Sequence, residues 1–329
     1  MSHDLLFCVK GNTSIDAQDV LDYFRQVPGF QVPDTAEGVF HIPYANKDTG
    51  VYFHFDVSAS LTEKNLQEAD TAEECHSVGI SFHINHNRPS FFAYESMPIV
   101  EAFAKRFQLL VVDLEADGDP QECKAETLIN SWQMHDALAS VMASSILTST
   151  GLGAIVGPGS NKMPEERALA WWRYAKDRDD LQKRLGTELF APRLWLVRKK
   201  GENEVSRGTV WTSGRPIVIP ECELFLIGPA SRSVLGKTEE GVATYDEVID
   251  CICQPQPTLL ERLSNKLGVR YDLGESPTPY LKPLDDPLPG LHVIENTQWK
   301  DVKRAVDKLK LMDGDDFLLV RPDSLVLTA

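Results

Sequence analysis

Two stretches in the first third of the chain alternate strictly between apolar and polar residues. Residues 51–57 read VYFHFDV, and residues 78–85 read VGISFHIN. Because side chains along a β-strand point to opposite faces in turn, this period of two predicts two strands, each with one face against a core and the other face open. The polar positions are His54, Asp56, His83 and Asn85. If the two strands pair, we expect these side chains to share one surface.

The remaining pattern of the first half predicts a mixture of strands and helices. Further strands are expected at Leu5–Lys10, Val39–Ile42 and Leu109–Leu114. Helices are expected from an N-cap at Ser14 to Arg25, after Pro98, and from Lys124 onward. The last helix runs into the uncharged stretch Ala137–Val156. We interpret that stretch as a buried helix rather than a membrane span, because serine, threonine and glycine dilute it and no aromatic or basic flanks surround it.

The second half opens with a helix from Pro164 and continues with strand-like runs at short intervals. These runs are Arg193–Arg198, Val205–Trp211, Pro216–Ile219 and Leu224–Ile227. Their connections have the composition of hairpin turns, so we predict an antiparallel meander. Beyond it, the pattern predicts helices at Thr258–Leu267 and Gln298–Leu311 and terminal strands at Asp316–Val320 and Ser324–Leu327.

Together these elements predict an α+β fold of mainly antiparallel sheets with packed helices, arranged in two subdomains. A glycine-rich stretch at residues 151–159 lies where the composition shifts, and we take it as the hinge. The predicted domains are an acidic N-terminal α+β domain, residues 1–157, and a C-terminal α+β domain with the meander, residues 158–329. The hinge lacks the Gly-Lys-Ser/Thr ending of a phosphate loop and follows a helix-like segment, and no cofactor is predicted.

The net charge of −16 is concentrated in the first half of the chain. Residues 1–150 contain 8 Lys and Arg against 22 Asp and Glu, whereas residues 151–329 contain 25 against 27. This balance argues against a nucleic-acid-binding surface, which needs a concentrated positive field. One interpretation is that the acids keep the protein soluble, and another is that they receive a cationic partner. The acids expected to contribute are Asp56, Glu63, Glu68, Asp70, Glu73, Glu74 and Glu95.

The cysteines and the N-terminus bear on the compartment. The 6 cysteines show no CxxC spacing, and the first residues lack the basic segment and long apolar run of a secretory signal. We therefore expect reduced thiols in a cytoplasmic protein that does not enter a membrane.

The open faces of the two alternating strands are the best candidate for chemistry. His54, Asp56 and His83 form a set that can hold zinc, and a His–Asp pair can support a general base. Ordinary polar residues on the wet side of a sheet are the favoured interpretation, because no Cys or Glu stands at a ligand-like spacing nearby. His83 and His86 point to opposite faces of a strand, so they cannot bind one ion without a bend. No catalytic residue is predicted.

Three segments within residues 40–228 form a familiar combination. They are Tyr44-x4-Thr49-Gly50-Val51-Tyr52-Phe53-x-Phe55, then Ile80-x-Phe82-x-Ile84-Asn85-x2-Arg88-Pro89-Ser90-Phe91-Phe92, and Phe190-x-Pro192-Arg193 followed by Val210-Trp211-x2-Gly214-x-Pro216-Ile217-x-Ile219-Pro220-Glu221. Together they resemble a loosely defined set of uncharacterised proteobacterial proteins, some of which look like immunity partners of polymorphic, interbacterial toxins. The matched positions are mostly structural. The resemblance implies a cytoplasmic protein that binds a toxin domain.

The leading hypothesis is therefore a toxin-neutralising, immunity-type binding protein rather than an enzyme. Its acidic surface would occlude a basic toxin domain, with charge complementarity setting a fast association rate. The alternative is a metal-assisted or His/Asp-based hydrolase that uses the face bearing His54, Asp56 and His83. A third hypothesis is a scaffold protein, which a large apolar surface patch and self-assembly would reveal.

Overall fold

The structure is a computed structural model that describes residues 2–11, 15–35, 38–58, 75–116, 118–149, 161–187, 189–211, 216–227, 233–234, 237–238, 241–253, 281–283, 292–294 and 309–328. It has the predicted α+β fold and divides into two compact units. The N-terminal unit comprises Met1–Leu169 and Arg321–Ala329, and the C-terminal unit comprises Ala170–Val320. The division falls inside helix α4 (Glu165–Leu185) rather than at residue 157, and the last strand of the chain belongs to the first unit.

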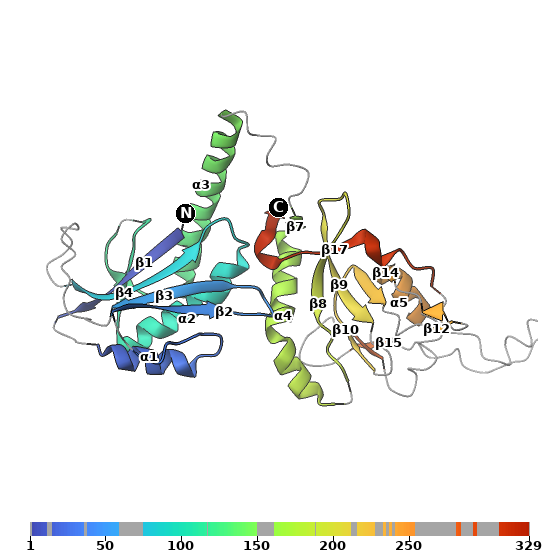
Figure 1. The fold of residues 1–329 in the computed structure, drawn as a ribbon, viewed down its shortest axis with the longest axis horizontal. Helices are drawn as coiled ribbons and strands as arrows, with labels where there is room; N and C mark the ends of the chain where they lie inside the picture. Colours follow the sequence, from blue (N-terminus) through green and yellow to red (C-terminus); the bar gives the residue numbers. More distant parts are fainter. Residues whose placement is uncertain are drawn as a thin grey trace, which may run out of the picture. The chain divides into compact units, whose positions relative to one another are not determined.

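A six-stranded antiparallel sheet forms the framework of the N-terminal unit (Figure 1). Its order is β2-β3-β4-β1-β5-β6. The strands are β1 (Ser2–Lys10), β2 (Val39–Ala45), β3 (Tyr52–Ser58), β4 (Cys75–Asn85), β5 (Leu110–Asp113) and β6 (Gln121–Glu122). The two alternating segments are β3 and β4. They pair directly with His54 opposite His83, so the expected pairing is confirmed.

One face of this sheet is covered by helices, and the other face is open. Phe24 of α1 (Ala17–Gln26), Phe103 of α2 (Phe91–Phe107) and Phe55 of β3 form an aromatic cluster with ring centroids 4.8–5.2 Å apart. Each of these rings is fully buried. Full burial of one such side chain contributes about 1.5–3 kcal/mol, so the apolar half of the alternation anchors the helices. A third helix, α3 (Ala125–Ser149), packs beside α2 and buries Trp132.

Two helix starts differ from the expectation. Asp16 caps α1 by accepting a hydrogen bond from the Gln18 N–H, whereas Ser14 lies outside the described residues. Helix α2 begins at Phe91 and contains Pro98 within it. The missing N–H of that proline does not end the helix, because the residues on both sides of it bury a continuous apolar face that outweighs one lost hydrogen bond.

The N-terminal unit is completed by a two-stranded parallel ladder. Strand β7 (Asn161–Pro164), just before α4, pairs with the terminal strand β18 (Leu325–Thr328). The predicted helix from Pro164 and the predicted terminal strand are thus both present. The chain's last strand therefore lies in the same unit as its first.

The C-terminal unit contains a five-stranded mixed sheet with order β14-β11-β9-β8-β17. The strands are β8 (Leu194–Lys199), β9 (Val205–Trp211), β11 (Leu224–Ile227), β14 (Gly241–Thr244) and β17 (Phe317–Leu319). The predicted hairpin of β8 and β9 is confirmed, but the meander beyond it is wrong. Strand β11 runs parallel to β9. The intervening β10 (Val218–Ile219) leaves this sheet and pairs with β16 (His292–Ile294), which also pairs with β15 (Leu281–Pro283).

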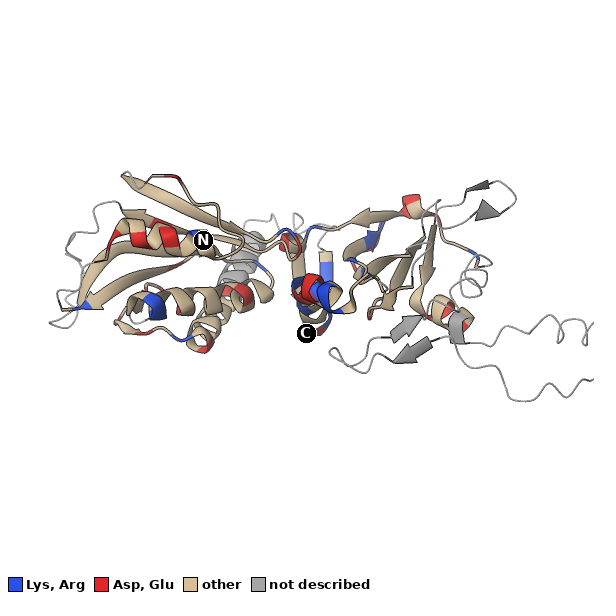
Figure 2. Cartoon of the chain, turned by 90° about the horizontal axis from the view of Figure 1, so that it is seen from below, with Lys and Arg blue, Asp and Glu red and all other residues tan. Residues whose placement is uncertain are grey.

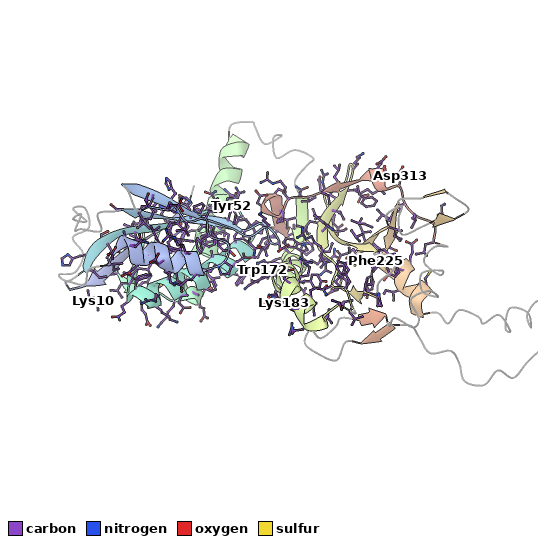
Figure 3. The ribbon with its side chains drawn as sticks, turned by 60° about the horizontal axis from the view of Figure 1, so that its bottom comes forward. Lys10, Tyr52, Trp172, Lys183, Phe225 and Asp313 are labelled. Carbon is purple, nitrogen blue, oxygen red and sulfur yellow. The ribbon has the colours of Figure 1, made fainter. Side chains whose placement is uncertain are left out.

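The core of the C-terminal unit gathers around Phe225 of β11, whose position among the strands is marked in Figure 3. Its ring lies 5.6 Å from that of Trp211, and α5 (Tyr245–Cys253) follows β14 on the same side, with the Tyr245 ring 6.2 Å away. This unit also contains a two-stranded antiparallel ribbon of β12 (Ser233–Val234) and β13 (Lys237–Thr238).

Some sequence predictions lie outside the described residues. These are the helix at Thr258–Leu267, residues 298–308 of the last predicted helix, the hinge at residues 151–159, and most side chains of the uncharged run Ala137–Val156. The run is helical up to Ser149, but Leu138 near its start is 55% exposed, so the prediction of a buried helix is wrong at that end. In the part of the chain that the structure describes, no helix is both long enough and apolar enough to cross a membrane.

Candidate metal centre

The register of the N-terminal sheet brings five titratable side chains together on its open face. Across β2, β3 and β4, His41 stands opposite Asp56, which stands opposite Ser81. Across β3, β4 and β1, His54 stands opposite His83, which stands opposite Asp4. His54 and Asp56 are two residues apart on β3, so they point to the same face of the sheet and the two cross-strand rows lie next to each other. We call Asp4, His41, His54, Asp56 and His83 the open-face cluster.

The Asp56 carboxylate lies at the centre of the open-face cluster. Its Oδ1 atom contacts His41 Nδ1 and lies 3.7 Å from His54 Nε2. Its Oδ2 atom lies 3.6 Å from Nε2 of His83. One ligand atom each from His41, His54 and Asp56 lies within 4.8 Å of the others. Ligand atoms around a tetrahedral zinc ion are about 3.4 Å apart. Side-chain rotations that separate His41 from Asp56 and bring His54 slightly closer to Asp56 would therefore suffice to bind one ion.

Asp4 holds the fifth member of the cluster in place. The Asp4 carboxylate is 2.8 Å from Nδ1 of His83, and the other ring nitrogen lies 2.8 Å from the Ser81 hydroxyl. The His83 ring stacks on the ring of His54 with centroids 4.9 Å apart. An imidazole oriented by a carboxylate on one nitrogen is the arrangement of a general base.

The cluster is open to solvent on one side. The side chain of His41 is 69% exposed and that of His54 is 41% exposed. Partial burial lowers the pKa of His54, an effect that the negative charge of Asp56 opposes. A lower pKa favours the neutral imidazole near neutral pH, and neutral imidazole is the form that binds a metal ion.

A shallow cavity of about 410 Å³ adjoins the cluster. His41, His54 and His83 line it together with Tyr52 and Asn85. It therefore offers space for a small molecule next to the three imidazoles, with an aromatic ring and an amide as further contacts.

The alternative set of sequence-predicted ligands, His54, Asp56 and His83, is therefore brought together by the structure. The sequence missed His41 and Asp4. His41 lies within the predicted strand Val39–Ile42, but nothing in that segment reveals which residue of β3 it faces. Asp4 reaches the cluster only because β1 pairs with β4. This pairing brings Asp4 into hydrogen-bond contact with His83, which is 79 residues away in the sequence.

The acids predicted to form a docking surface have different outcomes. Glu95 is a correction, because it is only 4% exposed and therefore cannot take part in a surface. Its carboxylate accepts hydrogen bonds from Tyr44, Asn46 and Thr49. Asp56 is one-quarter exposed and belongs to the open-face cluster. The other acids, Glu63, Glu68, Asp70, Glu73 and Glu74, lie outside the described residues.

No protein-family model, curated protein or solved structure gives a significant match to this chain. The resemblance to toxin immunity proteins therefore stays a prediction.

Proposed function

We propose that the N-terminal unit binds a divalent transition-metal ion of zinc's class at His41, His54 and Asp56, and uses it for metal-assisted hydrolysis. The observation that carries the proposal is the convergence of these two imidazoles and one carboxylate on a solvent-exposed sheet face. Two histidines and one carboxylate form a common ligand set of catalytic zinc sites, which keep a fourth position for water. The exposure of the face leaves room for that water.

The other two members of the open-face cluster, His83 and Asp4, would assist with proton transfer. A bound zinc ion would supply a water of lowered pKa, so a weak base would suffice to accept its proton. His83 lies beside Asp56 and is oriented by Asp4, so it can accept this proton. The adjoining cavity would place a small substrate next to the imidazoles of His41, His54 and His83.

Zinc content tests the binding step. The double variant His41→Asn with His54→Asn is expected to retain one zinc ion fewer per chain than the wild type, as measured by plasma mass spectrometry after dialysis. The matched control is His76→Asn, because His76 is an exposed histidine of the same sheet outside the cluster. Equal zinc content in the double variant and the wild type would rule out this site.

Hydrolysis of 4-nitrophenyl acetate by the zinc-loaded protein tests the catalytic step. His83→Ala is expected to lower kcat by about 10²–10⁴-fold, the usual contribution of a general base, while the zinc content stays at the wild-type value. An unchanged kcat in this variant, or an equal rate after zinc removal, would contradict the catalytic role.

Charge favours a second candidate function, the binding of a cationic protein such as a basic toxin domain. Acidic residues outnumber basic ones over the ribbon of the N-terminal unit (Figure 2), and the excess of 22 over 8 in residues 1–150 supports such a partner. Exposed acids among the described residues include Asp19, Asp22, Asp34, Asp119, Glu122 and Glu126.

Co-expression with the product of the neighbouring gene tests this second candidate. The hypothesis expects a stable complex that salt weakens, because screening reduces attraction between exposed charges. Reversing the charge of Asp70, Glu73 and Glu74 together is expected to slow association about tenfold or more. A complex that forms at the same rate with the reversed charges would show that these acids do not receive the partner.

A further inference from the structure

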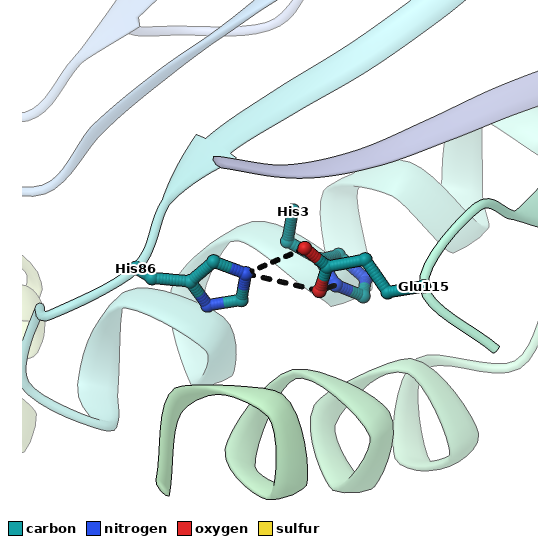
Figure 4. A group of neighbouring side chains, drawn as sticks. All are labelled: His3, His86 and Glu115. Carbon is teal, nitrogen blue, oxygen red and sulfur yellow. Dashed lines mark hydrogen bonds and ion pairs between the residues drawn. The ribbon is translucent and has the colours of Figure 1, made fainter. Parts of the chain in front are cut away.

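The covered face of the N-terminal sheet carries a second group of histidines and carboxylates, separate from the open-face cluster. His3 lies on β1, His86 follows β4, and Glu115 follows β5 (Figure 4). His3 is fully buried and His86 is 5% exposed, whereas the Glu115 side chain is 26% exposed. We call these three residues the buried cluster. Three chain segments that are remote in sequence therefore converge on one carboxylate.

The donor atoms of the buried cluster all face one another. His3 Nδ1 lies 2.9 Å from Glu115 Oε2, and His86 Nε2 lies 2.9 Å from both oxygens of the same carboxylate. All three ligand atoms lie within 4.8 Å of one another. Ligand atoms around a tetrahedral zinc ion are about 3.4 Å apart, so the cluster has to expand only slightly to admit one.

The far nitrogens of both rings lack hydrogen-bond partners and face further carboxylates. His3 Nε2 is buried without a hydrogen bond, 3.6 Å from the Asp113 carboxylate. His86 Nδ1 is likewise buried without one, 3.9 Å from Asp136. A histidine that binds a metal ion usually directs its other N–H toward a carboxylate, which orients the ring and makes it a better ligand. Such an outer carboxylate is present for each of the two rings.

These outer carboxylates are themselves held in place. Asp113 accepts hydrogen bonds from the Ser131 hydroxyl at 2.6 Å and from the Glu115 N–H at 3.0 Å. Asp136 accepts one from the Asn87 N–H at 2.5 Å. Buried polar groups that are fixed in this way rigidify a site, and rigid outer carboxylates position the inner ligands.

Charge balance gives an independent reason to expect a cation. Asp113, Glu115 and Asp136 meet only histidines in their ion pairs within the part of the chain that the structure describes. With neutral imidazoles, the site would therefore hold three largely buried negative charges, which is costly. A divalent ion between the imidazoles offsets most of that charge. A third imidazole, that of His135, lies with its ring centroid 6.3 Å from that of His3 and also has a buried nitrogen without a hydrogen bond.

We propose that His3, His86 and Glu115 form a second, buried binding site for a divalent transition-metal ion, with Asp113 and Asp136 orienting the two imidazoles. The ion would join the start of β1, the end of β4 and the segment between β5 and β6, and would therefore stabilise the fold of the N-terminal unit. A cavity of about 530 Å³ is lined by Asn87, Trp132 and Asp136, the last of which is the outer carboxylate of His86.

The test uses the double variant His41→Asn with His54→Asn, which removes the open-face site. Cobalt(II) replaces zinc and reports tetrahedral coordination by its visible absorption. We expect this variant to retain one cobalt ion per chain with that absorption, and zinc to raise its Tm by about 5–10 °C at saturation. Adding Glu115→Gln is expected to abolish the absorption and the Tm shift. Adding Glu122→Gln, at an exposed glutamate, is expected to leave both unchanged.

Retention of the same absorption and Tm shift after Glu115→Gln would overturn the proposal. So would the absence of bound cobalt before that substitution, because the cluster would then be an ion-free set of His–carboxylate pairs. If circular dichroism shows that the protein with Glu115→Gln does not fold, X-ray absorption spectroscopy of zinc bound to the variant His41→Asn with His54→Asn decides instead. A coordination shell that contains two imidazole nitrogens supports the buried site, and a coordination shell of oxygens alone overturns it. If the zinc-content test rules out the open-face site, the same cobalt and Tm measurements are made on Glu115→Gln in the otherwise wild-type protein. The failure of one proposed site can thus be distinguished from the failure of the other.

Discussion

Replacing Glu95 by alanine is expected to lower the free energy of unfolding of the N-terminal unit by about 3–5 kcal/mol. Glu95 lies in the first half of α2 and is 4% exposed. Its Oε1 atom accepts hydrogen bonds from the Tyr44 hydroxyl at 2.9 Å, the Asn46 amide at 2.8 Å and the Thr49 hydroxyl at 3.1 Å. Alanine would leave these three donors without their acceptor, and each unsatisfied buried group costs about 1–3 kcal/mol.

The loss follows from the position of this carboxylate between a helix and a turn. Tyr44 lies on β2, and Asn46 and Thr49 form the turn between β2 and β3, so Glu95 fixes that turn against α2. Burial, together with the negative charge of Glu95, raises the pKa of Tyr44 above its usual value. The variant is therefore also expected to lower the pKa of Tyr44, which an ultraviolet titration measures.

The matched control for this prediction is Glu101→Ala on the same helix. Glu101 pairs with Lys105 at the surface, and such exposed pairs contribute about 1 kcal/mol or less. Urea unfolding of both variants, followed by circular dichroism, measures the difference. A loss in Glu95→Ala as small as that in Glu101→Ala would mean that the buried carboxylate does not organise the turn.

In the C-terminal unit, Arg207→Met is expected to lower the free energy of unfolding by about 3–5 kcal/mol. The Arg207 side chain on β9 is 4% exposed, and its guanidinium donates to Glu223 Oε1 at 2.6 Å and to Glu221 at 3.3 Å. The backbone N–H of Arg207 also donates a hydrogen bond to Glu223 Oε2 at 2.6 Å. Methionine fills a similar volume but leaves the carboxylate of Glu223 without its cation.

A second substitution separates the net contribution of the Arg207–Glu223 ion pair to stability from the cost of leaving one of its charges unpaired. Arg207→Met combined with Glu223→Leu is expected to recover most of the lost stability, because well-packed apolar residues often replace a buried ion pair without loss. The surface control is Lys199→Ala, whose pair with Glu202 is about half exposed on both sides. If the double variant is no more stable than Arg207→Met, the uncompensated charge of Glu223 is not the cause.

The sequence predicted the open face correctly because strand alternation is a local signal. Seven or eight residues of period two suffice to assign His54, Asp56 and His83 to one face, and direct pairing of β3 with β4 then brings them together. The apolar half of the same pattern predicted the core around Phe55. Local pattern therefore fixed the face of each residue but not its neighbours on other strands.

The other proposed metal ligands depend on contacts that no local pattern encodes. His41 faces Asp56 through the register of β2 on β3, and His3 meets Glu115 across 112 residues of sequence. Pairing order in a sheet is a tertiary property, so neither contact was visible in the sequence. His86 was visible as a histidine on the opposite face from His83, but its partner Glu115 was not.

The meander failed for a related reason. The predicted strands Val205–Trp211 and Leu224–Ile227 exist, yet β11 joins β9 in parallel, because β10 between them is hydrogen-bonded to another sheet. Short connections favour antiparallel neighbours only when each strand pairs with the next. Here the partner of β10, β16, comes more than 70 residues later in the chain.

Diffraction from crystals of the zinc-loaded protein, measured at the zinc absorption edge, would locate the proposed ion. We expect an anomalous peak on the open face, at bonding distance from a nitrogen of His41, a nitrogen of His54 and an oxygen of Asp56. No peak at that position, with the three side chains placed as in zinc-free crystals, would contradict the proposed site.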